Sequence, residues 1–499
     1  MSGPLFPTAS LPLELVEDLR RQNPWWEGNP GPEVPSFRRW PFERLMARLG
    51  RPIAPILVIR GPRQIGKTTL QQQIIRELLA TGIDPRRILR VQFDELESHA
   101  RLEEPILRIA DWFERTVLGE TLNAAAAADR HAFLFLDEVQ NLPTWDAQLK
   151  SLVDHSTVRA MVTGSSALRI ALGRDSLAGR IQSFEVGPLR LAEIASLRGF
   201  GSLRPAQSEN GWSDWLDAGF WTALRASARK QEAVLSETYR AFSERGAYPF
   251  AQTSHDVGWP EVADYLTETV VKRVIEYDLR VGERGRKRDR VLLEAVFRMA
   301  CRYVGEAPNP ATLAREVDLT GGGHPGPQRV RHYIDFLDSS LLLRAIQPPE
   351  MRLKKRRGFA KLCLCDHALR AAWLHEVIPL DSPSLDRSPH LQDLAGRIAE
   401  SVVGYYFASL PGLGVAHLPA RGADPEVDFI LTIGEKRIPV EVKHRRAIDP
   451  MRDTLGLRAF IEKSVHNAPF GLLVTRDEND SVRDPRILSI PLRSLLIVR

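Results

Sequence analysis

The feature that most constrains this chain is a glycine-rich loop between an apolar run and a segment of helical periodicity. The run PILVI, residues 55–59, leads after one arginine into GPRQIGKT, residues 61–68. Apolar side chains then recur at helical spacing from Leu70 to Leu78. A strand, a glycine-rich turn and a helix in this order form a phosphate-binding loop, because backbone N–H groups and the helix N-terminus attract phosphate. The order predicts an α/β domain built on a parallel sheet.

The loop supplies the expected nucleotide contacts. We expect Lys67 to reach the β- and γ-phosphates of ATP and the Thr68 hydroxyl to bind Mg²⁺. The cofactor-binding residues expected here are Gly61, Pro62, Arg63, Gln64, Ile65, Gly66, Lys67, Thr68 and Thr69.

A second apolar run, Phe133 to Leu136, ends in two acids, Asp137 and Glu138. A buried strand that ends this way puts the acids at the carboxyl edge of the sheet, beside the nucleotide. We expect Asp137 to orient Mg²⁺ and Glu138 to polarise the attacking water as the catalytic base. The alternative for Asp137 is to cap the helix that follows.

Two further polar positions follow the same pattern. Ser165 comes directly after the apolar strand of VRAMVTGSS, where it either senses the γ-phosphate or belongs to a plain turn. Arg180, in SLAGRIQSF, is a candidate cation for transition-state charge, and a neighbouring subunit can supply such a cation. An ordinary surface arginine is the alternative.

Four segments together resemble the AAA-type ATPases of bacteria and archaea that carry a C-terminal domain of unknown function. They are NPWWEGNP (23–30), GPRQIGKTT, FLDEVQN and TGSSALRIALGRDSLAGR. The resemblance runs from about residue 20 to the end of the chain. It implies ATP and Mg²⁺ as cofactors, Arg180 at the position of an arginine finger, and a homo-oligomer, with a hexameric ring as one form.

Composition sets the remaining bounds. The 499 residues suggest two to four domains, and 43% hydrophobic with 26% charged residues is typical of a globular protein. Three cysteines suit a reducing compartment, and no signal peptide is visible. Residues 401–420 carry no formal charge, but Pro and Gly interrupt them, so we expect a helix, a turn and a strand rather than a membrane span. We therefore expect a cytoplasmic protein.

The middle of the chain predicts helices and then a winged helix. Residues 309–346 read as helix, glycine-rich turn, helix and strand. Net charge is only +5, yet basic runs recur at 284–290, 354–357 and 443–446, which makes a polyanion partner such as DNA plausible. The expected nucleic-acid contacts are Arg329, Arg331, Lys354 and Lys355. A winged helix that only spaces protein domains is the alternative.

The stretch VDFILTIGEKRIPVEVKHRR, residues 427–446, predicts a β-hairpin with a defined register. Gly434-Glu435 suits a two-residue turn, which would pair Ile433 with Lys436. Because side chains alternate between faces, this register sets Asp428 opposite Glu441 and keeps Lys443 on the same face.

Asp428, Glu441 and Lys443, with Glu400 on the preceding helix, resemble the acids and lysine of the PD-(D/E)XK nuclease fold. The resemblance implies a Mg²⁺ site, with Mn²⁺ as an alternative ion, formed by Glu400, Asp428 and Glu441, and a catalytic Lys443. Arg445 and Arg446 are expected to grip the nucleic-acid backbone. In the alternative, arginines such as Arg421 pair with the acids. Val427 stands where the fold often has proline.

These patterns predict an α/β protein with a P-loop AAA-type ATPase core, a helical and winged-helix middle, and a C-terminal α/β nuclease-like domain. The expected division is 1–40 extension, 41–200 ATPase, 201–304 helical lid, 305–377 winged helix, 378–390 linker and 391–499 nuclease-like domain. The expected function is an ATP-hydrolysing, DNA-directed motor or switch in repair, recombination or defence. The alternatives are a DNA-binding or branch-migrating ATPase whose nuclease-like domain does not cut, and an ATP-gated signalling switch with a protein partner.

Overall fold

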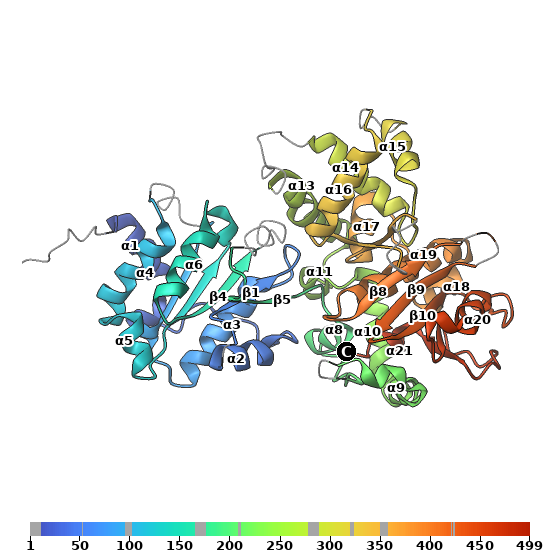
Figure 1. Ribbon diagram of the computed structural model, residues 1–499, viewed down its shortest axis with the longest axis horizontal. Coiled ribbons are helices and arrows are strands. Elements are labelled where there is room, and N and C mark those ends of the chain that lie inside the picture. The colour runs from blue at the N-terminus through green and yellow to red at the C-terminus, as the bar shows by residue number, and fades with distance from the viewer. Residues whose placement is uncertain are drawn as a thin grey trace, which may run out of the picture. The chain divides into compact units, whose positions relative to one another are not determined.

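The computed structural model describes residues 11–51, 53–94, 102–164, 176–207, 211–277, 289–319, 324–349, 358–420, 422 and 425–499. The predictions for Ser165, Lys354 and Lys355, and most of the basic run 284–290, lie outside these residues. The chain divides into two compact units, Met1–Val186 and Gly187–Arg499 (Figure 1).

The first unit contains a five-stranded parallel sheet in the order β2-β3-β4-β1-β5. Its strands are β1 (Ile56–Arg60), β2 (Ile88–Gln92), β3 (Phe133–Asp137), β4 (Arg159–Gly164) and β5 (Ile181–Glu185). Its α-helices are α1 (Leu13–Gln22), α2 (Phe42–Gly50), α3 (Lys67–Ala80), α4 (Pro105–Phe113), α5 (Leu122–Ala127) and α6 (Trp145–His155). Alternate apolar residues of the central strands pack with α1, α4 and α6 into one buried core. This confirms the parallel α/β domain.

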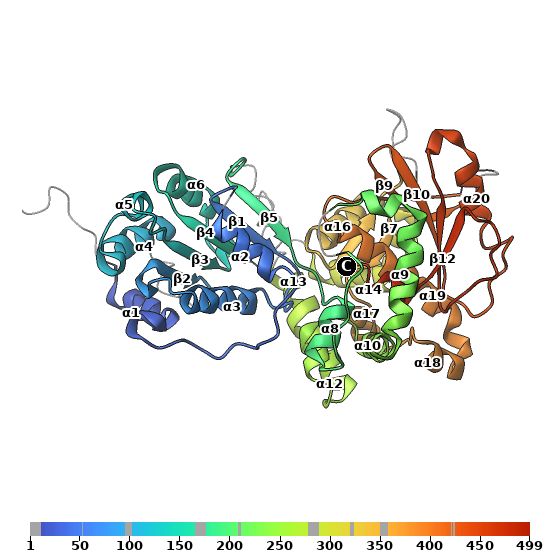
Figure 2. The ribbon, with the colours of Figure 1, turned by 90° about the horizontal axis from the view of Figure 1, so that it is seen from below.

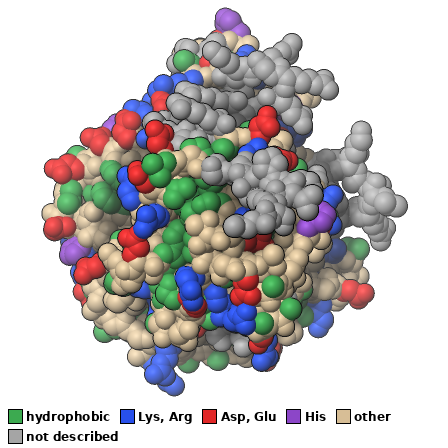
Figure 3. Space-filling model, turned by 90° about the vertical axis from the view of Figure 1, so that its left-hand side faces the viewer, with side chains coloured by type: hydrophobic (Ala, Val, Ile, Leu, Met, Phe, Trp, Pro, Cys, Tyr) green, Lys and Arg blue, Asp and Glu red, His purple; other side chains and the backbone are tan. Residues whose placement is uncertain are grey.

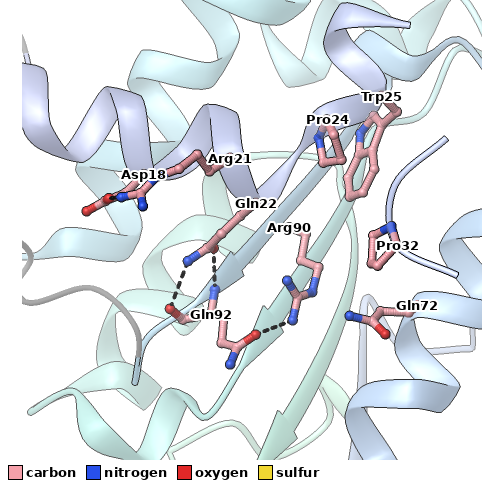
Figure 4. A pocket seen from close by; sticks show the side chains of 9 residues that line it. All are labelled: Asp18, Arg21, Gln22, Pro24, Trp25, Pro32, Gln72, Arg90 and Gln92. Atoms are coloured by element: carbon pink, nitrogen blue, oxygen red, sulfur yellow. Dashed lines mark hydrogen bonds and ion pairs between the residues drawn. The ribbon is translucent and has the colours of Figure 1, made fainter. Parts of the chain in front are cut away.

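Side chains cover the free edge of β2, which is the outer strand of this sheet. The Asn23 side chain accepts a 2.6 Å hydrogen bond from the backbone N–H of Arg90 and donates a 2.7 Å bond to its carbonyl. Gln22 does the same for Gln92, with bonds of 2.8 and 3.3 Å (Figure 4). Two amide side chains thus take the place of a neighbouring strand and satisfy an edge that would otherwise invite another chain.

The two tryptophans of the NPWW segment complete this cover. The indole N–H groups of Trp25 and Trp26 both donate to the carbonyl of Ile88, at 3.1 and 2.9 Å. Outward-facing backbone groups of an edge strand recur every second residue, and the cover therefore reaches Ile88, then Arg90, then Gln92. The segment expected to lie in an extension before the ATPase domain is thus built into the edge of its sheet.

The second unit contains a five-stranded sheet in the order β12-β11-β10-β9-β8 and a two-stranded antiparallel pair, β6-β7 (Figure 2). Strands β8, β9 and β10 are antiparallel, whereas β10, β11 and β12 are parallel. The strands are β6 (Leu343–Ile346), β7 (Lys361–Leu364), β8 (Gly414–Leu418), β9 (Val427–Ile433), β10 (Lys436–Lys443), β11 (Gly471–Thr475) and β12 (Ile487–Pro491).

The described residues of this unit also form α-helices. They are α8 (Leu191–Leu197), α9 (Ala218–Lys230), α10 (Glu232–Arg245), α11 (Pro249–Thr253), α12 (Trp259–Leu266), α13 (Arg273–Tyr277), α14 (Arg290–Arg302), α15 (Pro310–Leu319), α16 (Pro327–Ser339), α17 (His367–Leu374), α18 (Ser382–Arg387), α19 (Gln392–Ala408), α20 (Leu455–Glu462) and α21 (Leu492–Leu495). Helices α14, α15 and α16 contact one another, and β6 follows α16. The helix, helix and strand expected over residues 309–346 are present.

The segment from 378 to 390, expected to be a linker, is packed against the unit. It contains α18, and Leu380 and Leu385 are buried. The Ser243 hydroxyl donates a 2.8 Å hydrogen bond to Asp381, which also caps α18. Pro383 lies in the first turn of this short helix, and the segment is therefore not a free connection.

Residues 401–420 form the expected helix, turn and strand, as the end of α19 and then β8. None of the helices in the described ranges is long and apolar enough to cross a membrane.

The β9–β10 hairpin has the register that its turn predicts. Lys436 pairs with Ile433, and the pairing continues to Val440 opposite Phe429. Gly434 has a φ of 59°, a left-handed conformation that glycine adopts without a Cβ clash. The register does not slip up to the pair Val440–Phe429, and Glu441 and Asp428 are the next residues of the two strands.

Candidate functional site

The glycine-rich loop connects the carboxyl end of β1 to the first residue of α3. Gly66, just before that helix, has a φ of 87°. A Cβ on Gly61 would collide with the backbone carbonyl of Val186. The backbone N–H of Val186 donates a 2.9 Å hydrogen bond to the carbonyl of Arg60. The first glycine is therefore required for a close approach of two backbone segments, and the second for a turn into the helix.

The side chain of Lys67 is folded back over this loop. It is 6% exposed, and its Nζ donates to the carbonyls of Gly61 and Pro62 at 3.0 and 2.7 Å. These carbonyls hold the ammonium group above the loop, at the place where phosphate oxygens are expected.

Two hydroxyls converge on the acid at the end of β3. Thr68 donates a 2.8 Å hydrogen bond to Oδ2 of Asp137, and Thr163 on β4 donates to its Oδ1. Asp137 is 1% exposed, so the expected Mg²⁺ ligands Thr68 and Asp137 meet inside the site rather than at the surface. The donor set, a hydroxyl beside a carboxylate at the loop, fits Mg²⁺ bound together with a nucleotide.

A buried arginine on β2 also contacts this group, and the sequence analysis missed it. Nη2 of Arg90 lies 3.8 Å from Oδ2 of Asp137, and its Nε donates to Gln71 at 3.2 Å. Gln71 in turn donates to the Thr163 hydroxyl at 3.4 Å. A charged residue inside the apolar strand ILRVQ was the signal available, since a strand buried on both faces rarely holds an unpaired charge.

Glu138, the expected catalytic base, follows Asp137 in a left-handed conformation with a φ of 54°. Its carboxylate accepts a hydrogen bond from Gln140, and its backbone N–H donates to Asp137 at 3.1 Å. A non-glycine residue in this conformation is uncommon and turns the side chain out of the strand direction.

Arg180 does not join this site in its own chain. It precedes β5, whose first residue, Ile181, pairs with Ile56 at the start of β1, whereas the loop follows the other end of that strand. Its guanidinium forms two bonds with Asp154, at 2.5 and 3.1 Å. The arginine and the loop therefore lie at opposite ends of the parallel strands β5 and β1.

The second candidate centre lies on the β9–β10 hairpin. Asp428 and Glu441 are 6% and 9% exposed, and the N–H of Val442 donates a 2.9 Å hydrogen bond to Oδ2 of Asp428. Lys443 pairs with Oε1 of Glu441. Both carboxylates are therefore buried groups of an interior centre rather than part of a surface sheet. Arg421, named as an alternative partner, lies outside the described residues.

A lysine that the sequence analysis missed stands among these acids. Lys361, the first residue of β7, is 1% exposed. Its Nζ lies 3.1 Å from Oδ1 of Asp428 and 3.3 Å from Oε1 of Glu426, and it also contacts Glu400 on α19. No local signal marks this residue, because Glu400 and Asp428 are 39 and 67 positions away in the sequence.

Burial and charge shift the ionisation of these groups. Burial and the Asp428 charge raise the pKa of Glu441 to about 8 and that of Glu400 well above its usual value. Burial opposes ionisation of Asp428, yet Lys361 and Lys443 hold its pKa below the ordinary value. Burial by itself would also lower the pKa of Lys361, but the surrounding carboxylates raise it well above its usual value. The centre thus balances its acids with lysines.

The metal ion implied by the nuclease resemblance does not fit this arrangement. Both oxygens of Asp428 are engaged, one by Lys361 and one by the backbone N–H, and Glu400 contacts the same lysine. Within the described ranges, no group of three or more His, Cys, Asp or Glu side chains could hold a metal ion. The expected Mg²⁺ or Mn²⁺ site of Glu400, Asp428 and Glu441 therefore gains no support, because an amine lies where the cation was expected.

The expected nucleic-acid contacts are distributed over two surfaces. Arg329 and Arg331 are exposed on α16, and Arg329 lies 3.6 Å from Asp289. Arg446 is exposed after β10, while Arg445 pairs with Asp453.

His444 belongs to the same basic tail, but it is buried and faces away from any nucleic-acid backbone. It is 3% exposed, and its Nε2 lies 2.9 Å from the carbonyl of Leu380.

Two families match parts of this chain. Residues 54–195 match the family described as AAA domain, and residues 236–377 match a domain of unknown function, DUF8612. The chain therefore carries an AAA-type P-loop ATPase domain, and the five-stranded parallel sheet is typical of the core of such ATPases.

Relatives of this chain include two uncharacterised proteins. The one from Methanocaldococcus jannaschii is 24% identical over 384 residues, which cover 75% of this chain and 72% of that protein. The one from Mycobacterium tuberculosis is 22% identical over 404 residues, which cover 80% of this chain and 72% of that protein.

Similar solved structures include two that span most of their own chains. The Walker-type ATPase PABY2304 of Pyrococcus abyssi is 15% identical, with a TM-score of 0.35, and the match covers 69% of this chain and 99% of that chain. The structure of Drosophila ORC bound to DNA is 16% identical, with a TM-score of 0.24, over 75% of this chain and 96% of that chain. At these TM-scores the similarity supports no inference about ligand or activity.

Proposed function

We propose, from the AAA-type P-loop ATPase domain that this chain carries, that the protein hydrolyses ATP and uses the turnover to change how its second unit holds DNA. One observation carries the proposal: Lys67, Thr68 and Asp137 converge at the glycine-rich loop, with the Thr68 hydroxyl 2.8 Å from the Asp137 carboxylate. A loop of this kind without that acid would bind a phosphate but lack the means to organise its metal ion.

Each residue of the loop site has a distinct role in this proposal. Lys67 exchanges the Gly61 and Pro62 carbonyls for the β- and γ-phosphates. Thr68 and Asp137 hold Mg²⁺, which neutralises charge on the phosphates when bound with ATP. Glu138 accepts the proton of the attacking water. Backbone N–H groups of residues 61–69 bind the phosphate oxygens.

DNA contact is assigned to a winged helix formed by α14, α15, α16 and the β6-β7 pair. Its support is the mutual contact of the three helices and the exposed Arg329 and Arg331 on α16. Lys354 and Lys355 of the adjoining basic run are further proposed contacts. On the coloured part of the face drawn in Figure 3, Lys and Arg side chains are interspersed with Asp and Glu, so this part does not form a continuous basic surface.

The C-terminal sheet is proposed to be a nuclease-like domain that holds DNA, with Arg445 and Arg446 contacting the backbone. Helix α19, the antiparallel β8-β9-β10 and the parallel β11 supply the arrangement, and the buried Asp428 and Glu441 supply the acids. Cleavage is the second candidate. The confirmed hairpin register favours it, whereas Lys361 among the acids opposes it.

One assay separates these functions. ATP hydrolysis is measured with the full chain, with and without single-stranded, duplex and branched DNA, at rising salt. We expect hydrolysis that DNA stimulates and that loses this stimulation steeply as salt increases. Unchanged hydrolysis with every DNA would favour a signalling switch with a protein partner instead.

Lys67→Ala is the critical variant, and Lys150→Ala, which removes an exposed lysine of the same unit, is its matched control. We expect the first to abolish hydrolysis and the second to leave it unchanged. Undiminished turnover in Lys67→Ala would refute the proposed ATPase site.

Cleavage has its own test. DNA of the same shapes is incubated with Mg²⁺ or Mn²⁺ and analysed for strand breaks in the wild type, Glu441→Ala and Lys443→Ala. Breaks that both variants lose would establish the second candidate, and their absence in the wild type supports a domain that only holds DNA.

A further inference from the structure

We infer that Lys361 is a built-in replacement for the metal ion of the C-terminal centre, and that it fastens the β6-β7 pair to the C-terminal sheet while excluding divalent cations. The inference rests on the position of one amine. Nζ of Lys361 lies 3.1 Å from Asp428 and 3.3 Å from Glu426, and it contacts Glu400. Three carboxylates from two elements and a loop thus share one cation.

The contacts of Asp428 place a positive charge where a second cation would have to bind. Lys361 engages Oδ1, and the N–H of Val442 engages Oδ2. A divalent ion at Asp428 would lie beside the ammonium group of Lys361, and repulsion between the two positive charges would weaken its binding. Burial strengthens the exclusion, because Lys361 without its partners would be an unpaired charge in the interior.

The backbone fixes the lysine in place. Lys361 pairs with Ile346 across the β6-β7 ladder, and the next residue, Leu362, donates its N–H to the carbonyl of Glu306 at 2.8 Å. The ammonium also lies 5.2 Å from the centre of the Phe429 ring on β9. The strand and the Phe429 ring therefore position the Lys361 side chain at the centre.

The position of Lys361 gives the centre a role that does not require cutting. The lysine belongs to the segment matched by DUF8612, residues 236–377, whereas Glu400, Glu426 and Asp428 belong to the sheet domain that follows. The ion cluster joins these two parts of the second unit through a buried contact. A movement of the winged helix would thereby reach the sheet directly, without a bound metal.

Mn²⁺ binding to the full chain without nucleotide tests the inference. The variants are Lys361→Met, which keeps the unbranched stem against Phe429, and Lys436→Met, which removes an exposed lysine of the β9–β10 hairpin. We expect the wild type and Lys436→Met to bind Mn²⁺ alike. Lys361→Met should bind Mn²⁺ at least about tenfold more tightly than the wild type, a difference of ~1.4 kcal/mol in binding free energy. Adding Asp428→Asn to Lys361→Met should abolish this tighter binding.

Two outcomes would overturn the inference. One is a Lys361→Met protein that folds but gains no Mn²⁺ site. The other is a wild type that loses a Mn²⁺ site when Asp428 alone is changed to Asn, which would mean that metal and lysine coexist. This second comparison does not depend on the folding of Lys361→Met. Neither outcome involves the nucleotide loop, so failure here is distinguishable from failure of the ATPase proposal.

Discussion

The Thr68 hydroxyl and the Asp137 carboxylate form a 2.8 Å hydrogen bond across 69 positions of sequence. Thr68 is the second residue of α3, the helix that follows β1 and the loop, and Asp137 ends β3, two strands away from β1 in the sheet. Since both strands run parallel, their carboxyl ends meet at one edge, and the bond holds the two proposed Mg²⁺ ligands together before any nucleotide binds.

Replacing Thr68 by Val keeps the shape of the side chain but removes the hydroxyl. We expect the kcat for Mg-ATP hydrolysis to fall about 100-fold or more, ~2.7 kcal/mol of transition-state stabilisation, because the metal ion loses one of its two protein ligands. Steady-state hydrolysis measures the effect. Thr81→Val, at the far end of the same helix, is the matched control and should retain full activity, since its hydroxyl only bonds Leu78.

Replacing Asn23 by Leu uncovers the edge of β2. The side chain is fully buried and makes three hydrogen bonds, two to Arg90 and one to Leu19. Leaving buried backbone groups unsatisfied should lower the free energy of unfolding by about 3 kcal/mol. Urea denaturation measures it, with the exposed Asn29→Leu as control, which should change stability by less than about 0.5 kcal/mol. Equal effects for the two variants would contradict the edge-cover role.

If Arg180 is an arginine finger, it should act on the site of a neighbouring subunit. In its own chain it lies at the amino end of the parallel strands, whereas the loop follows their carboxyl end, and it pairs with Asp154. Arg180→Ala and Glu138→Gln should each lose ATP hydrolysis when assayed alone. A mixture of the two should regain part of it, since some interfaces then combine an intact arginine with an intact base.

The surface Arg130→Ala, whose pairing with Glu120 is exposed, is the control for this experiment and should keep its activity. An Arg180→Ala protein with wild-type turnover would assign the arginine a surface role only.

Two buried histidines should make the second unit sensitive to acid. Burial lowers the pKa of His417 and of His444 to about 4. In each, Nε2 faces a backbone carbonyl and Nδ1 is buried with no hydrogen-bond partner, so protonation would bury an unsatisfied cation. Between an unfolded pKa of about 6.5 and the folded value, the unfolded chain binds more protons, and stability therefore falls as pH falls through this window.

The measurement is urea denaturation at about pH 7.5 and about pH 5. The double variant with His417→Gln and His444→Gln should lose less stability on acidification than the wild type, by about 2 kcal/mol per histidine at pH 5. His255→Gln, at an exposed position, should behave like the wild type. Parallel losses in all three proteins would show that other groups govern the acid response.

The sequence by itself determined what depends on neighbours along the chain. The spacing of glycines after an apolar run predicted the loop between β1 and α3, and a two-residue turn at Gly434 predicted the register that runs from Ile433–Lys436 to Phe429–Val440. Both are local: turn geometry and side-chain alternation act over a few residues, so the residues that specify them are visible in one short stretch.

Only the tertiary structure decided which distant groups complete each site. Asn23 covers β2 from 67 positions away, and Lys361 reaches Asp428 across the same separation. Arg180, the candidate arginine finger, lies in its own chain near the start of β5, away from the end of β1 that leads into the loop. A hydrogen bond or an ion pair depends on where the folded chain brings two atoms, and burial then makes that pairing decisive, because an unpartnered charge in the interior is too costly to retain.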